Sequence, residues 1–324
     1  MTQSGRIIPS VFVIAAVTTL SSAPAWCGED TLRVAKSSPE TFSFVPLDIG
    51  IEAGIFKNNG IDVQIIGFSG GAKMQQALAA DSLDVAFGSG PQMILTAKGA
   101  PMMAVAEMAG APLNFAVIVP YDSPFKTLDD LKGKKIGVSG NPSLSSFMAE
   151  EIALTRGWGD NGITPVGIGG TNSGVVAALR THLVDAVTFD LRVGLQLEQV
   201  KEARVLAPCS DYIAHFITHA MFAQDNLIKN KPDALRRFLK SWFEAVTFMA
   251  SNKAMSVAVA SKITGAPTDL EALEYDHLVP KFFSHDGRFK QEDLAAVSKA
   301  LVMLQSTDKE PDMSKLYTEA FLPR

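Results

Sequence analysis

Two segments of this chain contain the same short motifs in the same order, and this repetition limits the folds that the chain can adopt. They read GGAKMQQALAADSLDVAFG (70–88) and GGTNSGVVAALRTHLVDAVTFD (169–190). In each, a Gly-Gly pair precedes a helical pattern that contains Ala-Leu, and an aspartate six residues after that leucine (Asp84 or Asp185) begins an apolar run. Helical spacing followed by apolar residues of period two predicts a helix and then a strand. The repetition therefore predicts two lobes that are built alike.

The same patterns continue on both sides of these segments. Strands are expected at 31–36, 60–68, 83–88, 134–140, 163–170 and 184–189, and helices at 44–56, 71–80 and 173–182. Another helix is expected after 134–140, with Asn141 as its N-cap and Pro142 at its first position. Alternation of strands and helices favours an α/β fold with mostly parallel sheets flanked by helices. The 324 residues are enough for two lobes, and helical patterns dominate after Lys231.

Two apolar runs are expected to lie where the chain crosses between the lobes. FAVIVP (115–120) follows the first pattern, and AHFITHAMFAQ (214–224, interpreted as a strand) follows the second. No low-complexity linker separates the patterns, which favours an interleaved topology. We therefore predict that 29–113 and 214–324 form one lobe and that 114–213 form the other.

The N-terminus has the features of an export signal. Arg6 precedes an apolar run at 7–20, and the small residues Ala23 and Ala25 follow it. This order is typical of a secretory signal peptide, and the apolar run is too short to span a membrane. We predict that 1–25 are removed near Ala25 and that the mature protein is periplasmic. Cys27 could pair with Cys209 or carry a lipid, although Trp26 departs from the usual lipobox, and the sequence leaves these alternatives open.

Charge and motifs disfavour several classes of function. The 29 Lys and Arg residues against 34 Asp and Glu residues give a net charge of −5, which disfavours nucleic-acid binding. GIGGTNSG lacks the third glycine of a dinucleotide fingerprint, and no P-loop motif occurs. No motif of a serine, cysteine or zinc hydrolase is present, so we expect no enzyme activity and no cofactor. His215 and His219 would lie roughly 13 Å apart on a strand, so no metal site is expected.

Four stretches resemble a known family. They are FVPLDIGIEAGIFKNNGIDVQIIGFSGGAKMQQALAADSLDVAFGSGP (44–91), TLDDLKGKKIGVSG (127–140), VVAALRTHLVDAVTFD (175–190) and NKPDALRRFLKSWFEAV (230–246). In order and spacing they are similar to periplasmic substrate-binding proteins of the nitrate/taurine/alkanesulfonate ABC-transporter type. The resemblance covers most of 31–250 and implies a two-lobed periplasmic binding protein fold (type II-like) with a helical C-terminal portion.

The same resemblance implies a function. Such proteins close on a small organic ligand, as monomers, and deliver it to an ABC permease and its ATPase. Members bind sulfonates, small carboxylates, aromatic acids or thiamin-precursor pyrimidines. We expect a small organic anion here. The alternatives are a thiamin-precursor pyrimidine, or an enzyme or a sensor on the same fold.

The predicted ligand contacts lie mainly in loops that join a strand to a helix. Helix N-termini have unpaired N–H groups and a partial positive charge, and ligands bind at the carboxyl ends of strands in such sheets. Arg192, near the start of a helix, suits a carboxylate or sulfonate, although a local pair with Asp190 or Glu198 is an alternative. Phe42 and Phe44 could contact a ring or could belong to the core, and His219 could donate to a ligand or be packed. The predicted contacts are Ser37, Ser38, Phe42, Phe44, Ser69, Gly70, Gly71, Ser89, Asn114, Ser139, Asn141, Ser143, Asn172, Asp190, Arg192 and His219.

Overall fold

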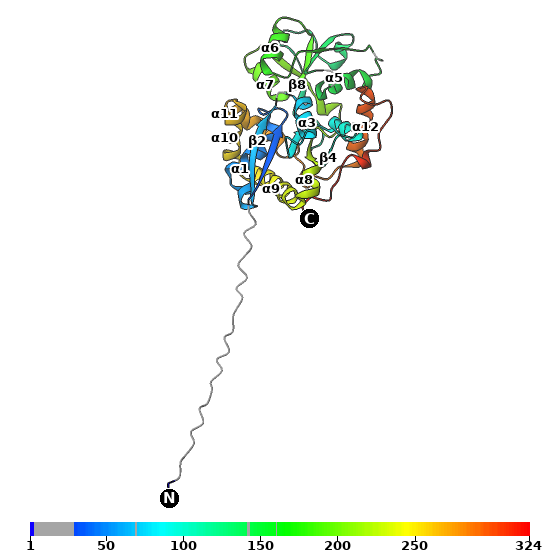
Figure 1. Cartoon of the computed structure of the whole chain (residues 1–324). Coiled ribbons are helices and arrows are strands. Elements are labelled where there is room, and N and C mark those ends of the chain that lie inside the picture. The colour runs from blue at the N-terminus through cyan, green and yellow to red at the C-terminus, as the bar shows by residue number, and fades with distance from the viewer. Residues whose placement is uncertain (3–28, 69, 141–142, 160) are drawn as a thin grey trace.

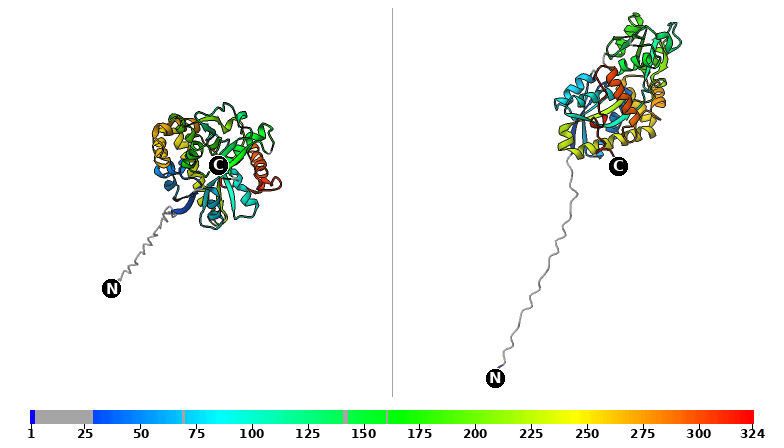
Figure 2. Two further views of the ribbon diagram at one scale, coloured as in Figure 1. Left: turned by 90° about the horizontal axis from the view of Figure 1, so that it is seen from above. Right: turned by 90° about the vertical axis from the view of Figure 1, so that its right-hand side faces the viewer.

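The chain forms two lobes, each built around one five-stranded sheet (Figure 1). A computed structural model describes residues 1–2, 29–68, 70–140, 143–159 and 161–324. Cys27, Ser69, Asn141 and nearly all of the predicted signal peptide lie outside the described residues. Figure 2 shows the two lobes from two further sides.

The two sheets have the same strand order. The first is ordered β2-β1-β3-β10-β4 and the second β7-β6-β8-β5-β9. The first sheet contains β1 (Asp30–Lys36), β2 (Ile61–Gly67), β3 (Val85–Gly88), β4 (Met102–Ala109) and β10 (His219–Gln224). The second contains β5 (Phe115–Pro120), β6 (Lys135–Val138), β7 (Thr164–Gly167), β8 (Ala186–Asp190) and β9 (Ala203–Pro208). The chain thus leaves the first sheet after β4 and returns to it with β10.

The sheets are mixed, with one strand of each running against the other four, which agrees with the prediction of mostly parallel sheets. β1 is parallel to β2 and β3, and β6 is parallel to β7 and β8. β10 is antiparallel to β3 and β4, and β5 is antiparallel to β8 and β9. β5 and β10 each follow a crossing between the lobes, so they enter their sheet from the side where the parallel strands end. A strand that enters from that side must run antiparallel to them.

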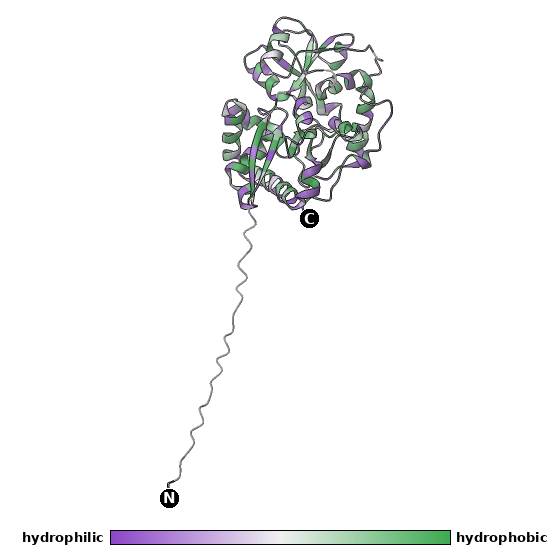
Figure 3. Ribbon diagram, in the orientation of Figure 1, coloured by the Kyte–Doolittle hydropathy of each residue, from purple (hydrophilic) through white to green (hydrophobic). Residues whose placement is uncertain are grey.

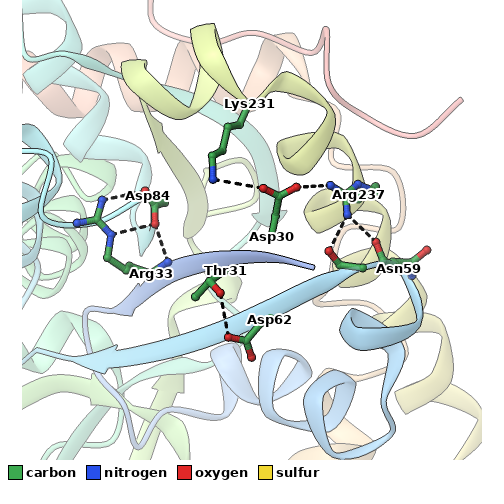
Figure 4. Close-up of polar contacts among 9 residues, drawn as sticks. Asp30, Thr31, Arg33, Asn59, Asp62, Asp84, Lys231 and Arg237 are labelled. Carbon is green, nitrogen blue, oxygen red and sulfur yellow. Dashed lines mark hydrogen bonds and ion pairs between the residues drawn. The ribbon is translucent and has the colours of Figure 1, made fainter. Parts of the chain in front are cut away.

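The repeated aspartates have the same structural role in both lobes. The Asp84 carboxylate accepts hydrogen bonds from the backbone N–H of Arg33 at 2.7 Å and from its Nε at 3.0 Å (Figure 4). The Asp185 carboxylate accepts the backbone N–H of Lys135 at 2.8 Å. Each aspartate directly precedes its strand: Asp84 joins β1 to β3, and Asp185 joins β6 to β8. The repetition in the sequence therefore corresponds to the same hydrogen bond between neighbouring strands in both lobes.

The helices cover the sheets and complete the first lobe. They are α1 (Val45–Glu52), α2 (Ile55–Asn58), α3 (Gly71–Ala79), α4 (Ile94–Ala97), α5 (Leu144–Thr155), α6 (Asn172–Arg180), α7 (Leu191–Gln199), α8 (Asp225–Asn230), α9 (Pro232–Ser251), α10 (Lys253–Thr264), α11 (Thr268–Leu278) and α12 (Gln291–Met303). Phe238 and Trp242 of α9 share a core with Phe87 of β3, so the C-terminal helices pack on the first sheet. Apolar residues follow the strands of both lobes in Figure 3. Among the described residues, no helix combines the length and apolar character that crossing a membrane requires.

Three predicted local features differ in the structure. The helix expected at 44–56 is interrupted, because Gly54 adopts a left-handed conformation (φ 73°) between α1 and α2. The N-cap of α5 is Ser143 rather than Asn141, and its hydroxyl accepts the backbone N–H of Ser146 at 3.1 Å. His215 lies outside β10, so it does not share a strand face with His219.

Candidate ligand-binding site at the lobe junction

A buried polar cluster lies where the chain crosses between the lobes. Asn114, which precedes β5, is 2% exposed, and its Nδ2 donates to the hydroxyl of Ser43 at 3.0 Å. The same Nδ2 lies 3.4 Å from Nε2 of His219, and Nδ1 of His219 lies 3.4 Å from the carbonyl oxygen of Gly88. We call Ser43, Asn114 and His219 the junction cluster. Asn114 and His219 were predicted contacts, and Ser43 was not.

The hydrogen bonds of this cluster select one tautomer of His219. The Gly88 carbonyl can only accept, so Nδ1 carries the proton and Nε2 accepts from Asn114. Burial lowers the pKa of His219 to about 4, which keeps the ring neutral at pH 7. The ring packs edge-on against Phe44 with centroids 5.0 Å apart. His219 therefore helps to orient Asn114.

This arrangement leaves an acceptor of Asn114 without a partner. With Nδ2 directed at Ser43 and His219, the buried Oδ1 of Asn114 has no hydrogen-bond partner among the described residues. A buried acceptor of this kind costs about 1–3 kcal/mol unless a donor reaches it. The junction cluster therefore has an acceptor that an N–H or O–H donor could satisfy.

The titration of His219 gives a testable consequence. An unfolded histidine takes up a proton near pH 6.5 but the folded one only near pH 4, so stability is lost as the pH falls through this interval. The free energy of unfolding is expected to fall by about 2 kcal/mol between pH 7 and pH 5 because of this residue. Urea unfolding of His219→Gln should lack that part of the pH dependence. The exposed His285→Gln variant should keep it, and equal pH dependence in all three proteins would contradict the assignment.

Asp190 and Arg192 lie next to the junction cluster. Asp190 is the N-cap of α7, and its carboxylate accepts the backbone N–H of Arg192 at 2.9 Å. The backbone N–H of Leu191 donates to the carbonyl oxygen of Asn114 at 2.9 Å, which joins the two sites. Burial raises the pKa of Asp190, and the charge of Arg192 and the hydroxyl of Thr41 oppose this only in part. Asp190 is half-buried and thus adds a second acceptor beside Asn114.

The guanidinium of Arg192 faces two glutamates and a backbone carbonyl, although its Nε makes no hydrogen bond among the described residues. Its Nε lies 3.2 Å from Oε2 of Glu274, and its Nη1 lies 3.9 Å from Oε1 of Glu271. Its Nη2 donates to the backbone carbonyl of Glu40 at 3.3 Å. Burial raises the pKa of Glu271, and burial and the charge of Asp190 hold the pKa of Glu274 well above its usual range. We call Asp190, Arg192, Glu271 and Glu274 the acidic cluster. The sequence analysis missed both glutamates, since they come from α11 in the part of the chain that resembles the family least.

The predicted contacts in the loop after β1 have different environments. Ser37 is half-buried and Ser38 is exposed. Phe42 and Phe44 are 1% and 0% exposed and belong to the core of the first lobe, which agrees with the alternative considered for them. The loop thus brings its backbone and Thr41, rather than its aromatic rings, to the lobe junction.

The glycine-rich stretch before α3 is used mainly for packing. The backbone N–H of Gly70 donates to the carbonyl of Ser37 at 2.9 Å. A Cβ added at Gly71 would lie 1.9 Å from Nε2 of Gln92, so this glycine makes room for that side chain. Oε1 of Gln92 accepts the backbone N–H of Ser89 at 3.1 Å and Nε2 of Gln75 at 2.8 Å. The glutamine pair was not predicted, and it explains why small residues recur here.

Two further predicted contacts of the second lobe, Ser139 and Ser143, lie just before α5. The hydroxyl of Ser145 lies 3.0 Å from the hydroxyls of both Ser139 and Ser143 and accepts the backbone N–H of Ser139. Asn172, at the first turn of α6, is exposed. Ser139 and Ser143 are half-buried, so this serine group remains a candidate donor set for a ligand.

A groove of about 980 Å³ lies elsewhere, between α5 and the end of α12. Its lining includes Glu150, Leu154, Met303 and Gln305, and none of the predicted contacts that the structure describes. Nor do any three His, Cys, Asp or Glu side chains in the described ranges form a group that could hold a metal ion. Cys209 is buried and forms no disulfide with any residue that the structure describes. The junction and acidic clusters are therefore the candidate site.

Solved structures share this fold at low sequence identity. The periplasmic aliphatic sulphonate binding protein SsuA of Escherichia coli superposes with a TM-score of 0.72 at 20% identity, over 89% of this chain and 92% of that one. The desulfurization enzyme DSZB also shares the fold, with a TM-score of 0.62 at 16% identity, over 90% of this chain and 97% of that one. The fold is thus that of periplasmic solute-binding proteins, and it also serves an enzyme.

A family model gives the family, and curated sequences resemble the chain. A provisionally named binding protein of Brucella abortus is 29% identical over 218 residues, which are 66% of this chain and 66% of that protein. A provisionally named thiamine biosynthesis protein of Haemophilus influenzae is 28% identical over 239 residues, 71% of this chain and 73% of that protein. The family model described as NMT1/THI5 like matches residues 41–254. The protein therefore belongs to the NMT1/THI5-like family, within the periplasmic binding protein fold that the sequence predicted.

Proposed function

We propose that the protein is the periplasmic solute-binding component of an ABC importer. It binds a small organic molecule between its lobes as a monomer and delivers it to a permease and its ATPase. The fold, the family and the relatives named as binding proteins support this role. The signal peptide predicted at 1–25 would export the chain to the compartment where such proteins work.

We further propose that the solute donates N–H groups and is uncharged or cationic, as a thiamin-precursor aminopyrimidine is. The single observation that carries this proposal is the buried Oδ1 of Asn114, which has no partner among the described residues and belongs to a residue whose backbone lies close to that of the acceptor Asp190. Both atoms accept hydrogen bonds, so they match a ligand that donates them. The name of the Haemophilus influenzae relative refers to thiamine biosynthesis, which agrees with the pyrimidine alternative.

A small organic anion, the class expected from the sequence, is the second candidate. The alkanesulfonate-binding protein of Xanthomonas axonopodis pv. citri, solved with MOPS bound, shares the fold at 17% identity, and the serine group at α5 offers hydroxyl donors. The acidic cluster opposes an anion, however, because Arg192 is already paired with Glu274 and Asp190 would repel negative charge. The charges therefore favour the first candidate.

A thermal-shift panel separates the two candidates. The probes are a 4-aminopyrimidine, ethanesulfonate and benzoate, each added to purified protein. A ligand at a hundred times its Kd should stabilise the fold by about 2.7 kcal/mol, which raises the melting temperature measurably. We expect the shift with the aminopyrimidine, and a shift with ethanesulfonate or benzoate alone would contradict the ligand class.

The same incubation tests for catalysis. A binding protein returns its ligand unchanged, whereas an enzyme such as one with the DSZB fold converts it. We expect mass spectrometry to recover the aminopyrimidine unaltered after incubation with the protein. A new product would assign the protein to the enzyme alternative.

A further inference from the structure

Arg192 makes a contact between elements that are anchored in different lobes. On the side of the second lobe, Leu191 and Val193 of α7 belong to the core that includes Ala116 and Val187 of the second sheet. On the other side, Tyr275 and Leu278 of α11 belong to the core of the first lobe. Arg192 therefore reaches from one lobe to the glutamates of the other.

This contact is almost completely buried. The side chain of Arg192 is 4% exposed, and those of Glu271 and Glu274 are 0% and 4% exposed. The two glutamates lie three residues apart on α11 and thus face the guanidinium together. We propose that Arg192, Glu271 and Glu274 form a latch that holds the two lobes together in the absence of solute.

The energetics of burial give the latch its effect. When the lobes separate, all three side chains become hydrated, so the ion pairs contribute to closure rather than to the folding of either lobe. Removing the guanidinium would leave the buried carboxylates uncompensated, which is strongly unfavourable, whereas removing one carboxyl charge leaves Arg192 beside the other two. Without Arg192, closure would bury two glutamates that face each other and Asp190, and the open arrangement would be favoured.

The latch is also expected to respond to pH. The groups that face it are Asp190 and Arg192 at the start of α7, Glu271 and Glu274 on α11, the hydroxyls of Thr41 and Thr264, and the carbonyl of Glu40. Three carboxyl groups surround one guanidinium, so closure favours protonation of a carboxyl. The pKa of Glu274 is raised when the lobes are together, and closure is therefore strongest at low pH and weakens as the pH rises.

The latch concerns the same junction as the proposed function and rests on it in one respect, namely that the lobes open and close. The latch would stabilise the closed state, so the solute would have to contribute less binding free energy to close the lobes. Its test uses protein without solute. If the lobes do not depend on the latch, the thermal-shift panel still identifies the ligand class. If no probe in the panel binds, the effect of the latch can still be measured.

The experiment compares Arg192→Met, Glu274→Gln and wild type by small-angle X-ray scattering. Each protein is unfolded, washed free of solute and refolded, and the radius of gyration is measured at pH 6 and pH 8. The exposed Asp269→Asn variant on the same helix serves as the matched control. Circular dichroism verifies that each variant is folded.

We expect Arg192→Met to shift to a larger radius of gyration than wild type at both pH values. Wild type should expand from pH 6 to pH 8, and Glu274→Gln should stay compact because it lacks one surplus carboxylate. If Arg192→Met fails to fold, the comparison of wild type with Glu274→Gln decides. Equal radii for wild type and Glu274→Gln at both pH values, or for wild type and folded Arg192→Met, would overturn the latch.

Discussion

Replacement of Lys36 by methionine is expected to lower the free energy of unfolding by about 3–5 kcal/mol. Lys36, at the end of β1, is 1% exposed and forms an ion pair with Asp48 of α1. Methionine fills much of the same space but leaves the Asp48 carboxylate buried without its partner, and removal of one member of a buried pair is costly. Urea unfolding followed by circular dichroism measures the loss.

Two further variants distinguish this ion pair from simple packing. Lys36→Met combined with Asp48→Asn removes both charges and should recover most of the lost stability. Lys57→Met changes an exposed lysine of the neighbouring α2 and should have little effect. The loss in Lys36→Met should shrink as the pH falls, because protonation neutralises the abandoned Asp48 carboxyl. A loss below about 1 kcal/mol at pH 7 would contradict the role of the pair.

The second large effect concerns the affinity for the solute. Asp190→Asn is expected to weaken binding of the 4-aminopyrimidine about 100-fold, or about 2.7 kcal/mol, because a charge-assisted hydrogen bond is lost. Asparagine is an equally good N-cap, so its side-chain oxygen can still accept the backbone N–H of Arg192. Isothermal titration calorimetry of both proteins with the same probe measures the change.

The matched control for this variant lies next to the same strand, β8. Asp185→Asn makes the same chemical change where the carboxylate accepts the backbone N–H of Lys135, at the opposite end of β8 from Asp190. Its affinity for the aminopyrimidine should equal that of wild type. If Asp190→Asn binds the aminopyrimidine as tightly as Asp185→Asn does, Asp190 does not contact the solute.

Several features of the fold could be predicted from local sequence. The strand predicted at 31–36 is β1 (Asp30–Lys36), since apolar residues of period two mark it. The repeated aspartates correctly indicated two lobes built alike, because each directly precedes a strand and joins it to an equivalent parallel strand, β3 to β1 and β8 to β6. The mixed character of the sheets could not be predicted in this way, because the direction of β5 and β10 depends on where the chain crosses between the lobes.

The residues of the candidate site could also be predicted only in part. Asn114, Asp190 and His219 were predicted contacts, and the structure brings them to one junction with a buried acceptor and a half-buried carboxylate. Whether they contact a solute remains a prediction that the variants above test. Gly70 and Gly71 were predicted to offer backbone donors, but the N–H of Gly70 is used by Ser37 and Gly71 makes room for Gln92.

The sequence by itself determined the class of fold and the repeated lobe plan. These depend on the periodicity of side chains. Only the tertiary structure decided the charge of the lobe junction. Arg192 suits an anion when its neighbours in sequence are considered, but Glu271 and Glu274 arrive from α11 and neutralise it. Electrostatic interactions depend on distance in space rather than on separation along the chain, so a distant helix could reverse the expected preference for a ligand.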